Sequence, residues 1–172
     1  MLDRRIVLGS IALGLASFSV ACASSGGLPA ILQQPDSDAT QGRFGVPPDS
    51  VIMVVWETIR TDEIGTRRFQ RAAQDTTGMA FLESDWVYVP RVLPSAPLTG
   101  LPEAEKWVKF LFWAFPEEGG TRLYAEGVFN PSQLPSEPPN WNLITIVPSA
   151  APAWQYIDVT YEQINRRLGA GN

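Results

Sequence analysis

Carboxylates are the main side chains in this sequence with a capacity for acid–base chemistry. The chain has 172 residues, no histidine and one cysteine, Cys22. Serine or cysteine catalysis with histidine, the usual zinc sites, and haem or iron–sulfur ligation depend on histidine or on several cysteines. The glycine pairs at 26–27 and 119–120 lack the pattern of a phosphate-binding loop. We therefore predict no metal, no cofactor and no enzymatic activity.

Four carboxylates lie in or beside segments that the sequence predicts to be strands. They are Glu57, Glu83, Asp85 and Glu126. Two of them could serve as the acid and the base of a glycosidase, so a hydrolase acting on cell-wall glycan is the alternative function. The simpler interpretation is that they face water or pair with Arg91 and Arg122. Strand alternation places Glu126 on the sheet face away from the core, where we expect it to be solvated.

Large aromatic residues are concentrated in residues 106–115. In a strand, Trp107, Lys109 and Trp113 share one face, and the other face is also apolar. A lysine can lay its stem over rings and keep its charge in water, so we expect this face to be the outer one. Trp107, Lys109 and Trp113 then form a candidate binding surface for an envelope protein, a peptide or a glycan. The alternative is that a proline-rich loop with Trp141, or the N-terminal tether, covers this face.

The N-terminus has the pattern of an export signal. Arg4 and Arg5 precede an uncharged run over residues 6–20, which is shorter than the ~20 apolar residues of a spanning helix. The sequence Ser19-Val20-Ala21-Cys22 resembles a bacterial lipobox. This resemblance implies cleavage before Cys22 and anchoring of the protein to a membrane through lipid on Cys22. The alternative is an ordinary secretory signal that leaves Cys22 as a free thiol.

Further features bear on the export route and on the partners. The Arg4-Arg5 pair, preceded by Asp3, also resembles the twin-arginine motif, so both export routes stay open. Ala23 is not the aspartate that retains enterobacterial lipoproteins at the inner membrane, and we expect the outer membrane, with the protein facing the periplasm. A net charge of −5 and only two lysines argue against a nucleic-acid partner.

Composition divides the chain into three parts. Residues 1–21 are the predicted lipoprotein signal peptide. Residues 22–48 are poor in apolar side chains and predict a lipidated, disordered tether. Residues 49–172 have the size of a single globular domain. The predicted protein is thus a membrane-anchored envelope component with a binding or structural role.

Local patterns predict the elements of this domain. The β-branched run at 51–56 predicts a central strand, and residues 61–78 predict a helix that ends at Gly78. Residues 80–90 predict a second strand, in which Trp86 and Tyr88 point to one face.

The second half of the domain has clearer signals. Residues 106–115 and 121–129 flank a Gly-Gly turn and predict a β-hairpin; a helix from Pro102 is the alternative for the first of them. Residues 143–147 predict a short strand, and apolar spacings of three and four predict a helix at 153–168. Together the elements predict an α+β domain with a single antiparallel sheet of about four to five strands and two helices packed on one face.

Overall fold

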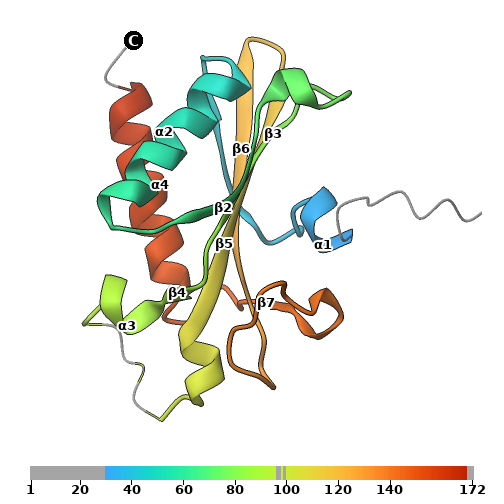
Figure 1. Cartoon of the computed structure of the whole chain (residues 1–172). Coiled ribbons are helices and arrows are strands. Elements are labelled where there is room, and N and C mark those ends of the chain that lie inside the picture. Colours follow the sequence, from blue (N-terminus) through green and yellow to red (C-terminus); the bar gives the residue numbers. More distant parts are fainter. Residues whose placement is uncertain (1–29, 96–97, 99, 170–172) are drawn as a thin grey trace, which may run out of the picture.

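The fold is an α+β arrangement around one open antiparallel sheet (Figure 1). The computed structural model describes residues 30–95, 98 and 100–169. Within this part of the chain there are seven strands and four α-helices. The predicted class is confirmed, but the sheet has more strands than the four to five expected. The signal peptide and Cys22 lie outside the described residues.

The sheet is built around a long central hairpin. Its strands are β1 (Thr40–Phe44), β2 (Thr66–Gln70), β3 (Ala80–Ser84), β4 (Val87–Tyr88), β5 (Trp107–Glu117), β6 (Gly120–Phe129) and β7 (Thr145–Ile146). The main path runs β1-β6-β5-β3-β2, while β4 pairs with β5 and β7 pairs with β6. Gly119 has a φ of 80° in the turn between β5 and β6, a conformation that favours glycine. The predicted hairpin is confirmed, and the helix from Pro102 is wrong.

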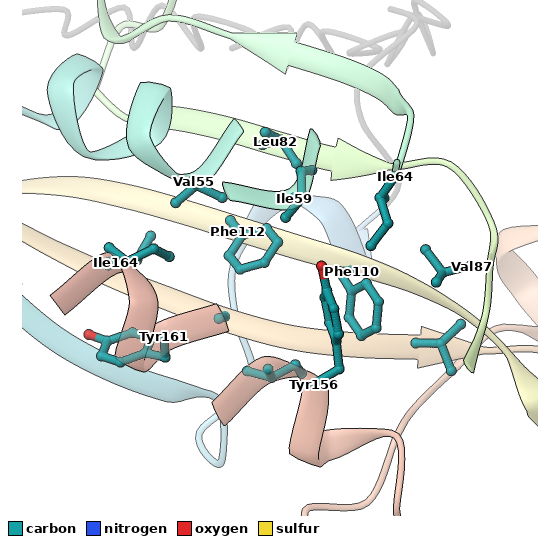
Figure 2. Packing of buried hydrophobic residues seen from close by; sticks show 14 of the residues in the cluster. Val55, Ile59, Ile64, Leu82, Val87, Phe110, Phe112, Tyr156, Tyr161 and Ile164 are labelled. Carbon is teal, nitrogen blue, oxygen red and sulfur yellow. The ribbon is translucent and has the colours of Figure 1, made fainter. Parts of the chain in front are cut away.

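Two long helices cover one face of the sheet. The α-helices are α1 (Ala30–Gln33), α2 (Pro48–Thr61), α3 (Val89–Val92) and α4 (Trp154–Gly169). In Figure 1, α2 and α4 lie on the same side of the sheet. Of these two, only α4 was predicted as a helix. Alternate residues of β5, among them Phe110 and Phe112, point towards them (Figure 2). The rings of Phe110 and Tyr156 stack with centroids 4.5 Å apart, so α4 is part of the main core.

The opposite face, called the second face below, is covered as well. Leu32 of α1 packs there on Phe81 and Trp113, and Trp141 adds to the cover from the long loop after β6. Figure 1 shows α1 and this loop on the side of the sheet away from α2 and α4. The sequence offered the proline-rich loop with Trp141 or the N-terminal segment as the cover of this face, and the structure has both.

The predicted boundary of the tether needs correction. Residues 30–48 belong to the folded part, because β1 pairs with β6 from Thr40↔Ala125 to Phe44↔Thr121. Backbone hydrogen bonds to an edge strand do not require apolar side chains, and only every second residue of β1 has to face the core. A polar composition was therefore compatible with a strand in this segment.

Two predicted elements in the first half of the domain are wrong. Residues 51–56 lie in helix α2, whose buried residues Val51, Ile52, Val55 and Ile59 have helical spacing. Pro48 at the first helical position and Asp49 in the first turn favour this start. The segment predicted as a helix at 61–78 contains the end of α2, strand β2 and a short 3-10 turn, η1 (Ala72–Gln74). Phe69 of β2 packs its ring on Trp56 of α2, with centroids 6.5 Å apart.

Candidate functional site

The residues of the predicted binding surface lie in different environments. Trp107 is partly exposed, whereas Lys109 and Trp113 are 0% exposed. The expectation that Trp113 would be exposed is wrong, because Leu32 covers it and accepts a hydrogen bond from its indole N–H at 3.1 Å. Lys109 is not at an outer surface either. Of the three residues, only Trp107 is therefore in contact with solvent.

The pairing of β4 with β5 creates an aromatic group on the second face. Val87 pairs with Val108 and Tyr88 with Trp107. Both valines are buried in the core beneath α2 and α4, so Tyr88 and Trp107 point the other way. Their ring centroids are 5.0 Å apart. Trp86 precedes this pair, and we call Trp86, Tyr88 and Trp107 the aromatic shelf; all three are half-buried.

A buried ion cluster adjoins the aromatic shelf. The Lys109 ammonium lies 3.1 Å from Glu83 Oε1 and 2.9 Å from Glu137 Oε1, and it donates to the Ser84 carbonyl oxygen at 3.2 Å. It also lies 5.3 Å from the centre of the Trp86 ring, a cation–π distance. The three donors of the ammonium thus have three oxygen partners, as a fully buried lysine requires.

Two adjacent arginines of β2 extend the cluster. Arg68 Nε is 3.8 Å from Glu83 Oε2, and Arg67 Nε is 3.5 Å from Glu137 Oε2. The pairing of β2 with β3 has a register shift between Thr66 and Arg68. Such a bulge interrupts strict alternation, which lets two neighbouring arginines serve carboxylates of the same cluster.

Glu137 comes from residues 130–140, which we call loop 130–140. The Trp86 indole N–H donates to the Ser136 carbonyl oxygen at 3.2 Å, so both Trp86 and Lys109 hold this loop. At its start, Asn130 Oδ1 accepts from the N–H groups of Ser132 and Gln133. Leu134 is 59% exposed. The loop lies over the cluster without contributing much apolar cover of its own.

The carboxylates considered for catalysis are dispersed. Glu57 is exposed and lies 3.8 Å from Arg167, and Asp85 is exposed. Glu83 and Glu126 both pair in register with Leu111, so the three side chains form one row across the sheet. Leu111 is fully buried between them. In a glycosidase, the substrate and the attacking water lie between the two catalytic carboxylates. Here that space is filled by the Leu111 side chain, so the arrangement does not support a hydrolase.

Arg91 and Arg122 do not pair with these carboxylates. Their partners are Glu63 and Glu117. Among residues 30–95, 98 and 100–169, no group of carboxylates, histidines and cysteines is arranged to hold a metal ion.

Glu126 faces away from the long helices, as predicted, but it is 1% exposed and not solvated. Burial raises the pKa of its carboxyl group to about 7. A hydrogen bond from the Asp36 N–H, 2.9 Å from Oε2, acts in the opposite direction. The segment between α1 and β1 thus closes over a carboxylate that the strand pattern alone would leave in water.

Several hollows lie elsewhere on the described part of the molecule, among them a polar groove and an apolar pocket. An open polar groove of about 700 Å³ is lined by Asp36, Phe115 and Tyr124, among others. An apolar pocket of about 320 Å³ lies between Leu101, Phe129 and residues 150–153, which precede α4. None of these hollows includes the buried ion cluster, so we centre the candidate site on the aromatic shelf and the cluster beside it.

Some residues of this site could be predicted from the sequence. The predicted shared face of Trp86 and Tyr88 is supported by their contacts, because Tyr88 packs on Trp107 and Trp86 lies over the Lys109 ammonium. Arg67, Arg68 and Glu137 were missed, because their partners lie far away in the chain. One signal was available: Lys109 within an apolar strand requires a carboxylate partner if it is buried.

No helix in the described part of the chain combines the length and the apolar character needed to cross a membrane. Comparisons with protein-family models, with curated proteins and with solved structures find no significant match to this chain.

Proposed function

We propose that this protein is a lipid-anchored component of the bacterial envelope that acts by binding a partner and not by catalysis. The anchor is supported by the likeness of Ser19-Val20-Ala21-Cys22 to a lipobox and by the apolar run before it. Lipid on Cys22 would hold the protein at a membrane, and we propose the periplasmic face of the outer membrane.

The start of the fold sets how far the domain could lie from its anchor. Helix α1 begins at Ala30, so only residues 23–29 separate it from Cys22. At ~3.3–3.6 Å per extended residue, this segment spans at most about 25 Å. In this proposal the domain works close to the membrane, in contrast to the long tether that composition suggested.

The binding role is carried by one observation, the partly exposed aromatic shelf, in which three large rings lie together beside the buried ion cluster. Tyr88 and Trp107 contact each other on the second face, and Trp86 lies against the buried ion cluster. Clustered tyrosine and tryptophan side chains are typical of interaction sites, because they supply a large contact area at a small cost in conformational entropy. We propose the aromatic shelf as the binding surface in place of the Trp107–Lys109–Trp113 face.

The anchor is tested by Cys22→Ser. Two acyl chains supply about 0.8 kcal/mol per buried CH₂, so the variant should leave the membrane fraction in an alkaline wash, while Ser24→Ala should stay. Labelling with a clickable fatty acid should be lost only with Cys22→Ser. Sedimentation of both variants with the membranes would contradict the proposed anchor.

The binding surface is tested by site-specific photo-crosslinking in intact cells. A photoreactive residue in place of Trp107 should give discrete adducts. The control position is Val159 of α4, which is 42% exposed and belongs to the helix layer. Equal adducts from both positions, or none from position 107, would count against the aromatic shelf as the binding surface.

A further inference from the structure

We propose that Glu137 acts as an internal ligand of a carboxylate socket, and that a proline-containing segment of a partner protein displaces it with a glutamate of its own. The socket consists of Arg67, Trp86 and Lys109. This proposal deepens the proposed binding function, since the socket adjoins the aromatic shelf.

The contacts of Glu137 resemble those of a bound peptide. Its two carboxylate oxygens lie 2.9 Å from Lys109 Nζ and 3.5 Å from Arg67 Nε. One residue earlier, the main-chain oxygen of Ser136 accepts from the Trp86 indole at 3.2 Å. One side chain and one peptide carbonyl are therefore recognised together, a combination that a segment from another chain can reproduce.

The socket without Glu137 has an excess of positive charge. Lys109 keeps Glu83 and the Ser84 carbonyl, but its third donor then lacks an oxygen. Arg67, Arg68 and Lys109 would stand against a single carboxylate, Glu83. The uncompensated positive charge of the open socket therefore favours the binding of another carboxylate, which forms charge-assisted hydrogen bonds with these side chains.

Loop 130–140 is suited to leave without unfolding the domain. The Glu137 side chain is 38% exposed, whereas that of Lys109 is 0% exposed, so the anion approaches from outside and the cation belongs to the sheet. Outside the loop, Ile146 and Trp141 pack on the second face. Opening the loop therefore removes polar contacts and leaves most apolar contacts of the core in place.

The resident occupant indicates the class of partner. The segment Pro135-Ser136-Glu137-Pro138-Pro139 places a glutamate among prolines, whose rings fix φ and limit the conformations of the free chain. A segment with a restricted backbone loses little conformational entropy on docking. The partner is thus a protein segment with a glutamate in a proline-containing context, and its flanking residues would lie near the aromatic shelf.

The test supplies the occupant as a separate molecule. The probe is a fluorescein-labelled, end-blocked peptide with the sequence of residues 133–140, and the control peptide has glutamine in place of the glutamate. The receptor is the full chain in detergent with residues 131–139 replaced by an equally long Gly-Ser linker. Fluorescence anisotropy should show the glutamate peptide binding at least tenfold more tightly than the control peptide.

The wild-type chain should bind the peptide probe only weakly. A tethered ligand competes at an effective concentration near millimolar, so the wild type should bind the probe at least tenfold more weakly than the linker variant. Glu137→Gln in the intact chain weakens this competition and should bind the probe more tightly than the wild type. This second variant keeps the loop and serves as the receptor if the linker variant does not fold.

Substitutions in the socket locate the binding. Arg67→Gln in the linker variant, or in the Glu137→Gln background, should weaken binding of the probe several-fold. Arg166→Gln on the exposed side of α4 is the matched control and should have no effect. No binding of the probe, equal binding of both peptides, or equal effects of the two arginine substitutions would overturn the proposal.

Two further outcomes separate the possible errors. Self-association of the wild type that Glu137→Gln abolishes would assign the socket to a second copy of this chain and would overturn the separate partner. If the peptide probe does not bind but crosslinks from position 107 persist, the socket is ruled out and the aromatic shelf remains the proposed binding surface.

Discussion

The indole N–H of Trp113 donates to the carbonyl oxygen of Leu32 at 3.1 Å, across 81 positions of the chain. The Leu32 side chain is 0% exposed on the same face of the sheet. This contact joins the N-terminal segment to the central strand and explains why the second face of β5 is not open. Residues 30–48 are therefore part of the folded domain, and they help to cover the second face of its sheet.

We expect Leu32→Ala to lower the free energy of unfolding by about 2–5 kcal/mol, the usual cost of a leucine-sized cavity. Urea unfolding should reveal the change. Leu134→Ala, at an exposed position, is the control and should change the stability by less than about 0.5 kcal/mol. Similar stabilities for both variants would mean that α1 does not hold the second face.

The core between the sheet and helices α2 and α4 should respond to cavities in the same way. Ile157 and Ile164 of α4 are buried beneath the sheet, so replacing either by alanine should cost about 2–5 kcal/mol. Val159→Ala on the exposed side of the same helix should have a small effect. Unchanged melting temperatures for the two isoleucine variants would show that this face of α4 is not in the core.

The two lysines of the chain offer a direct comparison. Lys109→Met leaves Glu83 buried without its nearest cation, and removing one partner of a buried pair costs about 3–5 kcal/mol. Lys106→Met affects a surface pair with Glu103, worth about 0–1 kcal/mol. The double variant Lys109→Met/Glu83→Gln should recover part of the loss in urea unfolding. Additive losses in the double variant would argue against the pair.

Glu126 should make the stability depend on pH. The pKa of its carboxyl is about 7 in the folded protein, above the usual value of 4.5. Between these values the unfolded chain releases the proton first, so the stability falls as the pH rises from about 4.5 to 7. At roughly 1.4 kcal/mol per pH unit, the loss reaches about 3 kcal/mol.

The matching variant is Glu126→Gln, which cannot ionise. Relative to the wild type, it should gain stability between pH 5 and pH 8, as measured by urea unfolding at both values. Glu57→Gln, at an exposed position of α2, is the control and should not alter the pH dependence. Parallel curves for the wild type and Glu126→Gln would contradict the raised pKa.

The sequence by itself determined the elements whose patterns are local. The β5–β6 hairpin follows from two β-rich runs around a Gly-containing turn, and α4 follows from apolar residues at spacings of three and four. Alternation along β5 also showed that both of its faces are apolar. These features depend on residues close together in the chain, so a local pattern contains the necessary information.

Tertiary structure decided the elements with conflicting local signals. The β-branched residues of 51–56 favour a strand, yet α2 is a helix because its apolar side pairs with α4 and the sheet. The polar segment around β1 became a strand because β6 offered an unpaired edge. Packing and backbone pairing with distant segments outweighed propensities that amount to less than about 1 kcal/mol per residue.

The candidate site was decided in the same way. Lys109 was visible in the sequence as a charge within an apolar strand, but its partners Glu83 and Glu137 come from other segments. Whether such a lysine faces water or a carboxylate depends on which loop covers it. Burial is a property of the assembled chain, because the solvent around a side chain is removed by residues that can lie anywhere in the sequence.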